Sequence, residues 1–345
     1  MRCDLASPAG SSLVKFKRSV LNSILFPLSD LLEHSTVNAV AEAGADPSGN
    51  KDSTAAIHLA LSFGYDVYLG PGRFRVSGLL YPHFDGQRLV GAGDGLTEIF
   101  NDINGEPLWC YGNPYVADGA KQWAMLANLQ LKGNANALWG IFNPNAPLVD
   151  GNQNQSGQYE GVSSSPNNFY FGKTSTPFAD WRIAARGSKA DGVSVVGVGG
   201  GFSLHCSAWA AGFNGVRLWN GKDGLRVSGA SNGCAFRDFY ISGMSGVSWT
   251  EPDSPSSIPT SCTYENMIVQ QSGKGAKNRA IELLKSQGSD IKGLYLELNT
   301  AKGAIGDVFI GVSCVGLNIG PVRHRNGNGA PSIVIENQGN GTYVN

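Results

Sequence analysis

The chain of 345 residues has 26 basic and 27 acidic side chains, a formal net charge of −1, and charged residues make up only 15% of it. This balance provides no electrostatic attraction for nucleic acid or for an anionic membrane surface, so the composition excludes both kinds of partner. Low charge together with 47 glycines is typical of a chain whose surface is polar but largely uncharged, and the length is sufficient for a large core.

Residues 1–36 are expected to form a neck or association segment. Within it, Val20–Leu32 is apolar enough for an amphipathic helix, which Pro27 would break. Pro27 and Asp30 also interrupt the apolar run, so the segment predicts neither a signal peptide nor a membrane span. We therefore expect a protein that is assembled in the cytoplasm and is not inserted into a membrane.

Residues 37–345 are expected to form one repetitive domain that begins with a turn, a helix and two strands. The turn contains Asp46, and Asp52 or Ser53 would cap the helix that follows. The two strands are Asp66–Leu69 and Arg73–Val76, separated by a Pro-Gly pair. Catalysis by Asp46 or Asp52 is not expected, because acidic residues in a turn before a helix usually cap it.

A resemblance to a known family rests on these same segments. Gly44–Ile57 and Val67–Val76 together resemble the start of the pectate-lyase-like β-helices of phage tailspikes, and Asp4–Val14 resembles the neck that joins a tailspike's particle-binding head to its β-helix. The resemblance covers about residues 4–100 by motif. It implies a right-handed β-helix in a homotrimeric virion protein, attached to the phage tail or baseplate through its N-terminal segment, that binds and usually cleaves a bacterial surface polysaccharide. Both ends depart from the family pattern, because the head is missing or replaced and the C-terminal trimerisation region is short or absent.

A six-residue phrase, apolar–any–Gly/Asp/Asn–apolar–any–apolar, recurs along the second half of the chain. Its copies are Leu126–Leu131, Ala190–Val195, Phe213–Leu218, Phe236–Ile241, Tyr264–Val269, Ile291–Leu296 and Cys314–Ile319. The last six copies follow one another at intervals of 23 to 28 residues. Alternating apolar positions indicate strands, a period of this length indicates a stacked solenoid, and the central Gly, Asp or Asn suits a left-handed bend.

This pattern predicts an all-β parallel β-helix. A leucine-rich repeat is rejected because the apolar positions hold Val, Ile, Phe, Tyr, Met and Cys without a leucine frame. One buried stack is expected from equivalent positions in six copies: Val193, Val216, Phe239, Met267, Leu294 and Leu317.

The six cysteines are expected to be free thiols in the core. Cys234 and Cys262 each lie four residues before a turn position, so they should stack in neighbouring rungs, and Cys314 occupies an apolar position. Free thiols are typical of a chain that folds in a reducing cytoplasm.

Around residues 143–188 no copy of the six-residue phrase is recognisable. This segment, which contains Trp181 as a candidate sugar contact within Asp180–Arg182, is either a functional loop packed against the solenoid or a pair of degenerate rungs. We favour the loop.

Candidate catalytic residues follow from the chemistry of glycoside hydrolysis, which uses two carboxyl groups about 5–5.5 Å apart for retention or about 6.5–9.5 Å apart for inversion. The rung that contains Val247–Asp253 is longer than the one before it, so this stretch is expected to protrude as a loop. Glu251 and Asp253 are candidates for acid and base or nucleophile, in either order. The alternative is a solvated turn with incidental acids.

Neighbouring rungs add to this site. Trp249 adjoins the two carboxylates in sequence, Glu282 on the next rung is a third catalytic candidate, and Asp223 one rung behind is a candidate substrate contact.

Two outward columns on the repeated strands are candidates for substrate binding or for simple surface structure. Asp191, Asn214, Arg237, Glu265 and Lys292 alternate in sign towards the end, which favours a surface charge ladder. The second column, Ser194, Arg217, Tyr240, Ile268, Tyr295 and Asn318, offers Arg217, Tyr240 and Tyr295 for stacking on sugars and bonding their hydroxyls.

The favoured function is a tailspike depolymerase that hydrolyses capsule or O-antigen. The alternatives are a non-catalytic receptor-binding or structural tail protein, and a polysaccharide lyase that holds a uronate with Arg217, Arg226 and Arg237. No cofactor or metal is expected, because the five histidines are scattered without ligand spacing and no calcium loop or phosphate loop is present. The glycan, its linkage and the placement of the site within or between chains stay open.

Overall fold

The computed structural model describes residues 36–63, 66–102, 107–113, 120–137, 139–143, 187–228, 231–251, 258–271, 279–299 and 307–325, and the backbone of four further strands at 168–170, 177–179, 333–335 and 343–344. The expected neck, residues 1–36, lies outside this part of the chain except for Thr36. None of the described helices is long and apolar enough to cross a membrane.

Two long parallel sheets run along the molecule. The longer sheet contains β1 (Thr36–Asn38), β2 (Asp66–Tyr68), β4 (Arg88–Val90), β7 (Met125–Lys132), β11 (Lys189–Val196), β13 (Gly212–Asn214), β14 (Arg217–Trp219), β16 (Ala235–Ser242), β18 (Thr263–Gln270), β20 (Asp290–Glu297), β22 (Asn318–Ile319), β23 (Val322–Arg325) and β25 (Tyr343–Val344), and is joined by β3 (Gly72–Val76) and β5 (Thr97–Asn101). The shorter sheet contains β6 (Pro107–Cys110), β8 (Trp139–Asn143), β12 (Phe202–Cys206), β15 (Asp223–Val227), β17 (Trp249–Glu251), β19 (Ile281–Gln287), β21 (Val308–Val315) and β24 (Ile333–Ile335).

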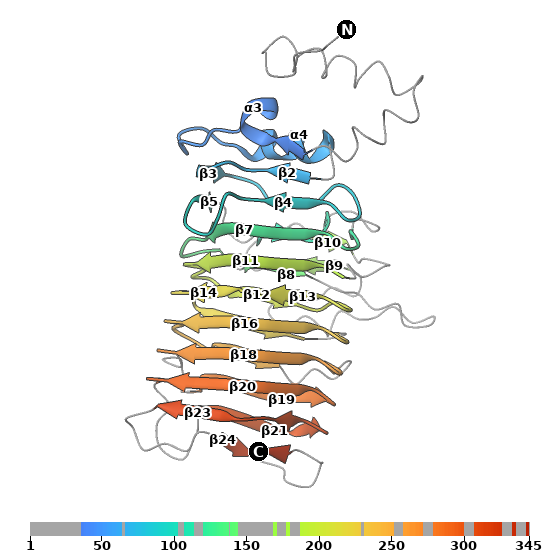
Figure 1. Cartoon of the computed structure of the whole chain (residues 1–345), viewed down its shortest axis with the longest axis vertical. Coiled ribbons are helices and arrows are strands. Elements are labelled where there is room, and N and C mark those ends of the chain that lie inside the picture. Colours follow the sequence, from blue (N-terminus) through green and yellow to red (C-terminus); the bar gives the residue numbers. More distant parts are fainter. Residues whose placement is uncertain are drawn as a thin grey trace, which may run out of the picture.

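Each rung of the solenoid contributes strands to both sheets. From β7 to β21, each rung contributes one strand (or the pair β13 and β14) to the longer sheet and then one strand to the shorter sheet. Equivalent strands of neighbouring rungs pair in parallel register. In Figure 1 the longer sheet runs to the left in front and the shorter sheet to the right behind while the chain descends, so the coil is right-handed. The predicted all-β parallel β-helix is confirmed.

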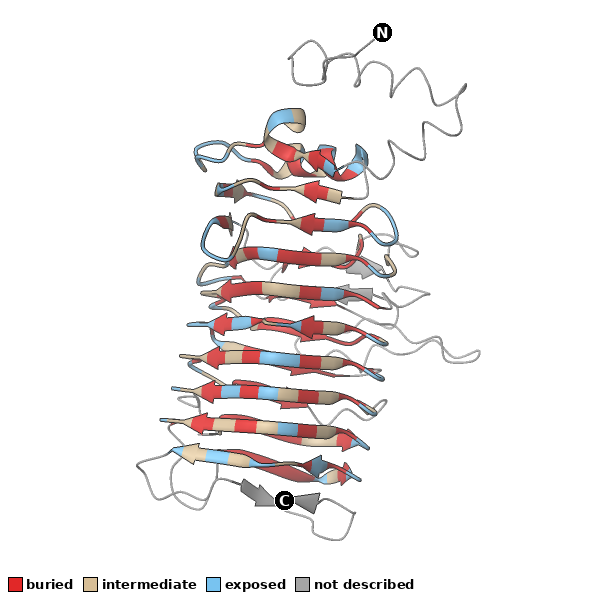
Figure 2. Cartoon of the chain, viewed as in Figure 1, coloured by how far each residue is buried: buried red, intermediate tan, exposed pale blue. Residues whose placement is uncertain are grey.

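The predicted core stack forms, with one error of register. Pairing aligns Phe239 with Met267 and Met267 with Leu294, and these side chains are buried, as are Val193 and Val216. Along the strands of the longer sheet, buried positions alternate with intermediate and exposed ones (Figure 2). Leu294, however, pairs with Val322 rather than with Leu317. Leu317 is also buried, but it lies before β22 in a different column.

Left-handed bends explain both the success and the error. The central bend holds Asn128, Gly192, Gly215, Asp238, Asn266 and Gly293, all with φ between 51° and 81° as the phrase predicts. A second such column follows each strand of the longer sheet at Gly197, Asn220, Gly243, Gln271 and Leu298, and a third precedes it at Trp123, Gly187, Ala210, Gly233, Ser261, Gly288 and Gly316. Gly316 belongs to the third column, so the phrase Cys314–Ile319 was aligned to the wrong bend.

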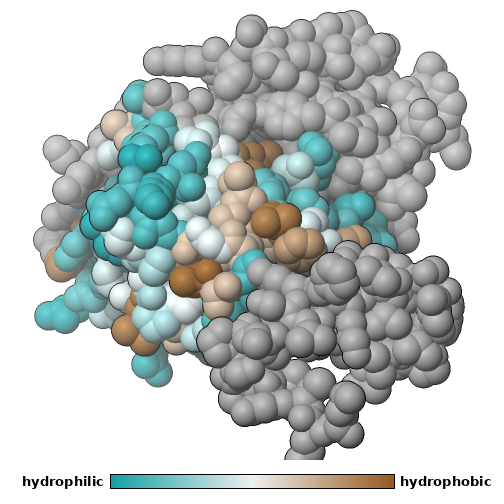
Figure 3. Space-filling view, turned by 90° about the horizontal axis from the view of Figure 1, so that it is seen from above, coloured by the Kyte–Doolittle hydropathy of each residue, from teal (hydrophilic) through white to brown (hydrophobic). Residues whose placement is uncertain are grey.

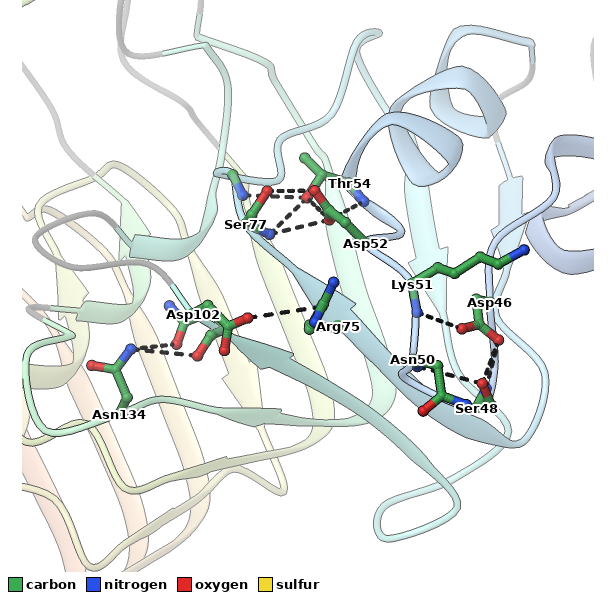
Figure 4. Close-up of polar contacts among 12 residues, drawn as sticks. Asp46, Ser48, Asn50, Lys51, Asp52, Thr54, Arg75, Ser77, Asp102 and Asn134 are labelled. Carbon is green, nitrogen blue, oxygen red and sulfur yellow. Dashed lines mark hydrogen bonds and ion pairs between the residues drawn. The ribbon is translucent and has the colours of Figure 1, made fainter.

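Two helices close the N-terminal end of the core. Asn38 caps α3 (Ala39–Ala43) through its side chain, and Asp52 Oδ1 accepts the backbone N–H of Thr54 at the start of α4 (Thr54–Phe63), 3.0 Å away. Asp46 instead organises the preceding turn by accepting from Ser48 and Lys51 (Figure 4). Seen from this end, the described surface is largely hydrophilic with small apolar areas near its centre (Figure 3).

The five cysteines of the described residues are buried and free, as expected. Pairing of Ala235 with Thr263 places Cys234 beside Cys262 in neighbouring rungs.

The segment around 143–188 lies mostly outside the described residues. β7 pairs directly with β11, and β8 with β12, so the two rungs on either side of the segment are adjacent. Its two described strands, β9 (Asn168–Tyr170) and β10 (Pro177–Ala179), pair antiparallel with each other.

Candidate functional site

Glu251 and Trp249 lie in the interior of the solenoid. The expectation of a protruding loop is wrong for residues 249–251, because they form β17 between β15 and β19. Alternation turns both side chains inward, where neither is exposed, and the Trp249 ring lies 4.3 Å from that of Tyr264. A polysaccharide outside the solenoid would not reach Glu251 here.

The carboxyl group of Glu251 is nevertheless unusual. The hydroxyl group of Tyr264 donates to its Oε1, while burial raises its pKa from 4.5 to about 7, against the opposing effect of hydrogen bonds from Tyr264 and Ser286. Burial penalises the charged form of a carboxyl group, so a raised pKa also arises in a core without any catalytic role. Glu251 is an interior acid.

The outer side of the shorter sheet carries a column in which four polar or charged side chains lie between two phenylalanines. It consists of Phe142, His205, Arg226, Thr250, Glu282 and Phe309, aligned by strand pairing and each at most 6% exposed. The alternate residues, such as Leu204 and Leu225, face the core. Charged groups are seldom buried unless they are paired, so this column is an electrostatically organised site.

Glu282 belongs to this column, and Asp223 lies close enough for the charges of the two groups to interact. Glu282 Oε1 forms an ion pair with Arg279 at 3.4 Å, and the Arg279 guanidinium lies 3.4 Å from the centroid of the Phe309 ring. Asp223, at the start of β15, accepts the backbone N–H of Val247 at 2.9 Å. Burial raises the pKa of Asp223, and the negative charge of Glu282 adds to this rise. The two carboxyl groups therefore interact although they lie two strands apart.

The basic side chains around this pair were only partly anticipated. Arg226 lies over the Phe202 ring at 5.2 Å, and His205 Nε2 is 2.7 Å from the hydroxyl group of Ser228. Burial lowers the pKa of His205 well below its usual value, helped by the charge of Arg226. Arg279 was missed because the phrase marks only the longer sheet, whose register says nothing about residues between rungs.

The outward face of the longer sheet contains the predicted charge ladder. Arg237 pairs with Glu265 at 3.0 Å, Lys292 lies 3.8 Å from the same carboxylate, and Asn214 donates to Asp191 at 2.9 Å. Each partner is the register neighbour on the adjacent rung. These contacts are those of a surface ladder.

The second outward column aligns Ser194, Arg217, Tyr240, Ile268 and Tyr295 as predicted, but it continues to Arg323 and not to Asn318. Tyr240 lies 5.7 Å from the partly exposed ring of Trp219, and the Tyr295 hydroxyl group donates to Glu297 at 3.1 Å. The result is an aromatic strip beside polar side chains.

Arg217 has a structural partner that the sequence did not indicate. Asp94 accepts from Arg217 at 3.1 Å and from the hydroxyl group of Ser194 at 2.7 Å. No local spacing relates Asp94 to residues 100 and 123 positions away. The remaining candidates, Asp253 and Trp181, lie outside the described residues.

No group of three or more histidine, cysteine or acidic side chains in the described ranges is arranged to hold a metal ion.

No protein-family model matches the chain, and a search of curated proteins finds no match. Among solved structures, the catalytic unit of a GH87 α-1,3-glucanase from Streptomyces thermodiastaticus is similar, with a TM-score of 0.51 and 18% identity, covering 83% of this chain and 42% of the glucanase. ORF18 of Geobacillus virus E2 has a TM-score of 0.40 and 14% identity, covering 96% of this chain and 62% of that protein. The Dettilon tailspike protein has a TM-score of 0.32 and 11% identity, covering 87% and 68%.

The similarity to the glucanase concerns the fold alone, since only 18% of the residues are identical. The chain spans about two fifths of the glucanase's length. The similarity to the glucanase catalytic unit thus agrees with the fold described above.

Proposed function

We propose that the chain is a phage tailspike that binds and cleaves a bacterial surface polysaccharide, capsule or O-antigen, by glycoside hydrolysis. The observation that carries the proposal is the pair Asp223 and Glu282 on β15 and β19 of the shorter sheet, whose charges interact, with the raised pKa of Asp223. The neck and β-helix motifs that resemble tailspikes supply the class of protein, and the glucanase's action on a polysaccharide agrees with it.

The two carboxyl groups have different surroundings. A raised pKa keeps Asp223 protonated to higher pH, which is what a general acid requires. Glu282, which forms the ion pair with Arg279, is the base or nucleophile. Protonation by Asp223 of the leaving oxygen would thus accompany attack assisted by Glu282.

The separation favours inversion of the anomeric centre. Asp223 lies three residues before Arg226, the residue of β15 that is in register with Glu282 two strands away. The two backbone positions are therefore about 14 Å apart, at ~4.8 Å per strand and ~3.3 Å per residue, before the side chains lean towards each other. This is nearer to the wider spacing, which leaves room for a water molecule, than to the 5–5.5 Å typical of retention.

Binding along the molecule is assigned to the aromatic strip of the longer sheet. Trp219, Tyr240 and Tyr295 would stack on sugar rings, and Arg217 would remain a contact through its exposed edge. Asp253 and Trp181 stay candidates for the substrate site. We further propose a homotrimer in the virion, attached to the tail or baseplate through the N-terminal segment.

A non-catalytic receptor-binding protein is the second candidate. The ladder and aromatic strip of the longer sheet favour it, because they offer binding without any acid and base. Lyase chemistry is a third, with Arg226 or Arg279 holding a uronate carboxylate beside the same acids.

The test is release of oligosaccharides from a panel of capsules and O-antigens. Asp223→Asn and Glu282→Gln should abolish release, whereas Asp191→Asn on the surface ladder should leave it intact. Hydrolysis yields saturated products whose first-formed anomer is inverted, and a lyase yields unsaturated ends. Binding without release by the unaltered chain would establish the second candidate, and a stable monomer in sedimentation would count against the tailspike.

A further inference from the structure

Two histidine rings meet at the N-terminal end of the solenoid, away from the proposed carbohydrate site. Nδ1 of His58 on α4 lies 3.0 Å from Nε2 of His83, which precedes β4. The other ring nitrogen of His58, Nε2, is 2.8 Å from the carbonyl oxygen of Leu79. A carbonyl oxygen only accepts, so Nε2 carries hydrogen, and Nδ1 of the neutral ring presents its lone pair towards His83.

Both rings are held in place by their surroundings. The Tyr81 ring stacks on His83 at 5.4 Å and lies 4.6 Å from His58. The backbone N–H of His83 donates to the side chain of buried Gln87, which in turn donates to the carbonyl oxygen of Leu61 on α4. The helix and the segment before β4 are thus tied together around the pair, which limits the ordering that a ligand would have to impose.

We propose that His58 and His83 bind one late first-row divalent metal ion, with Cu²⁺ or Ni²⁺ favoured. Two nitrogens bonded to a metal at about 2.05 Å are about 2.9 Å apart at a right angle and about 3.3 Å apart at the tetrahedral angle. The observed 3.0 Å matches the right angle, and tetragonal nitrogen and oxygen coordination is typical of those two ions. Water molecules complete the coordination.

The hydrogen bonding and the local charges fit this role. A metal-bound histidine commonly donates its second ring N–H to a backbone carbonyl, as His58 does to Leu79. The hydrogen that His83 Nε2 directs at His58 moves to Nδ1 of the same ring when the metal binds, so no net proton is released. Burial lowers the pKa of both rings and thus favours the neutral ligands.

Other charges near the pair set a limit on affinity. His58 and Lys121 both lower the pKa of His83, so the positive charge of Lys121 also opposes a cation. His58 and His83 are 25 residues apart in the sequence, which is about one rung. Conventional metal-binding motifs do not contain this spacing.

The test uses untagged chain freed of metal by a chelator and titrated with Ni²⁺ in a calorimeter at neutral pH. One ion per chain is expected. In His58→Gln the new amide still reaches the Leu79 carbonyl but Nδ1 is lost, and His83→Asn removes Nε2. Each variant should bind about tenfold or more weakly. His324→Gln, whose ring pairs with Asp307 at the other end of the solenoid, is the matched control and should bind as the unaltered chain does.

Thermal unfolding supplies a second readout. Ni²⁺ should raise the melting temperature of the unaltered chain and of His324→Gln but of neither other variant, because only the intact pair binds the ion in the folded state. Absence of binding at millimolar Ni²⁺, or equal binding in both pair variants, would overturn the proposal. If His58→Gln has a lower melting temperature than the unaltered chain in the absence of metal, the metal binding of His83→Asn decides the test.

Discussion

Replacing Glu251 by Gln tests whether this acid belongs to the core or to the chemistry. In the unfolded chain the Glu251 carboxyl group has its ordinary pKa of 4.5, and in the folded chain its pKa is about 7 because the group is buried. Below pH 4.5 the group is protonated in both states. Between pH 4.5 and about 7 the unfolded chain loses the proton first, so folding stability falls as pH rises.

The magnitude follows from the difference of the two pKa values. The two pKa values differ by about 2.5, which at ~1.36 kcal/mol for each pH unit amounts to about 3 kcal/mol. The natural chain loses this much folding stability between pH 4.5 and about 7, and the loss stays constant at higher pH. Glu251→Gln has no proton to lose and its amide oxygen still accepts from Tyr264. The variant should therefore match the natural chain at pH 4 and exceed it by about 3 kcal/mol at pH 8.

The assay is urea unfolding of both proteins at the two pH values, with polysaccharide cleavage measured in parallel. Cleavage should survive in Glu251→Gln, since the side chain lies inside the solenoid. A stability difference that does not depend on pH would refute the buried-acid argument. Lost cleavage with unchanged stability would return Glu251 to the catalytic site.

Four further outcomes are expected. Asp223→Asn should lower cleavage about 10²–10⁴-fold, as loss of a general acid does, and cleavage by the natural chain should fall as pH rises through the raised pKa of Asp223; an unchanged rate would exclude this role. Met267→Ala should cost about 2–5 kcal/mol in unfolding free energy, because it empties part of the buried stack. Gly215→Val should be destabilising by more than about 1 kcal/mol at its φ of 60°, whereas Gly215→Asn should be tolerated, and equal effects would argue against the bend. Removal of the exposed charge in Arg237→Ala should change the free energy of unfolding by no more than about 1 kcal/mol. A larger loss would show that the charge ladder contributes substantially to the stability of the longer sheet.

The sequence predicted the longer sheet far better than the shorter one. Its phrase combines two independent signals, the alternation that buries Phe239 and Met267 and the left-handed bend at Asp238 and Asn266, so most copies align correctly. The last copy was aligned incorrectly because Gly316 belongs to a different column of left-handed positions, the one that precedes the strands.

The candidate site was harder to predict because it lies on strands without a phrase. Trp249–Glu251 has no Gly, Asp or Asn bend, and a glutamate offers no hint that it faces a core, so β17 was interpreted as a loop. Counting rungs predicted correctly that Glu282 faces outward one rung after β17 and that Asp223 lies one rung before it. Arg279 pairs with Glu282 only three residues away, but it precedes β19, which carries no phrase. Asp94 contacts Ser194 a hundred residues away, which one sequence does not encode in its periodicity.

The most direct measurement is a crystal structure of the Asp223→Asn variant soaked with oligosaccharides from a polysaccharide that the unaltered chain cleaves. The account predicts a sugar chain across the outer side of the shorter sheet, with one glycosidic oxygen within hydrogen-bonding distance of the residue at position 223 and a water molecule held by Glu282 on the opposite face of the ring. Sugar bound only on the longer sheet, or with neither position near a glycosidic bond, would contradict it.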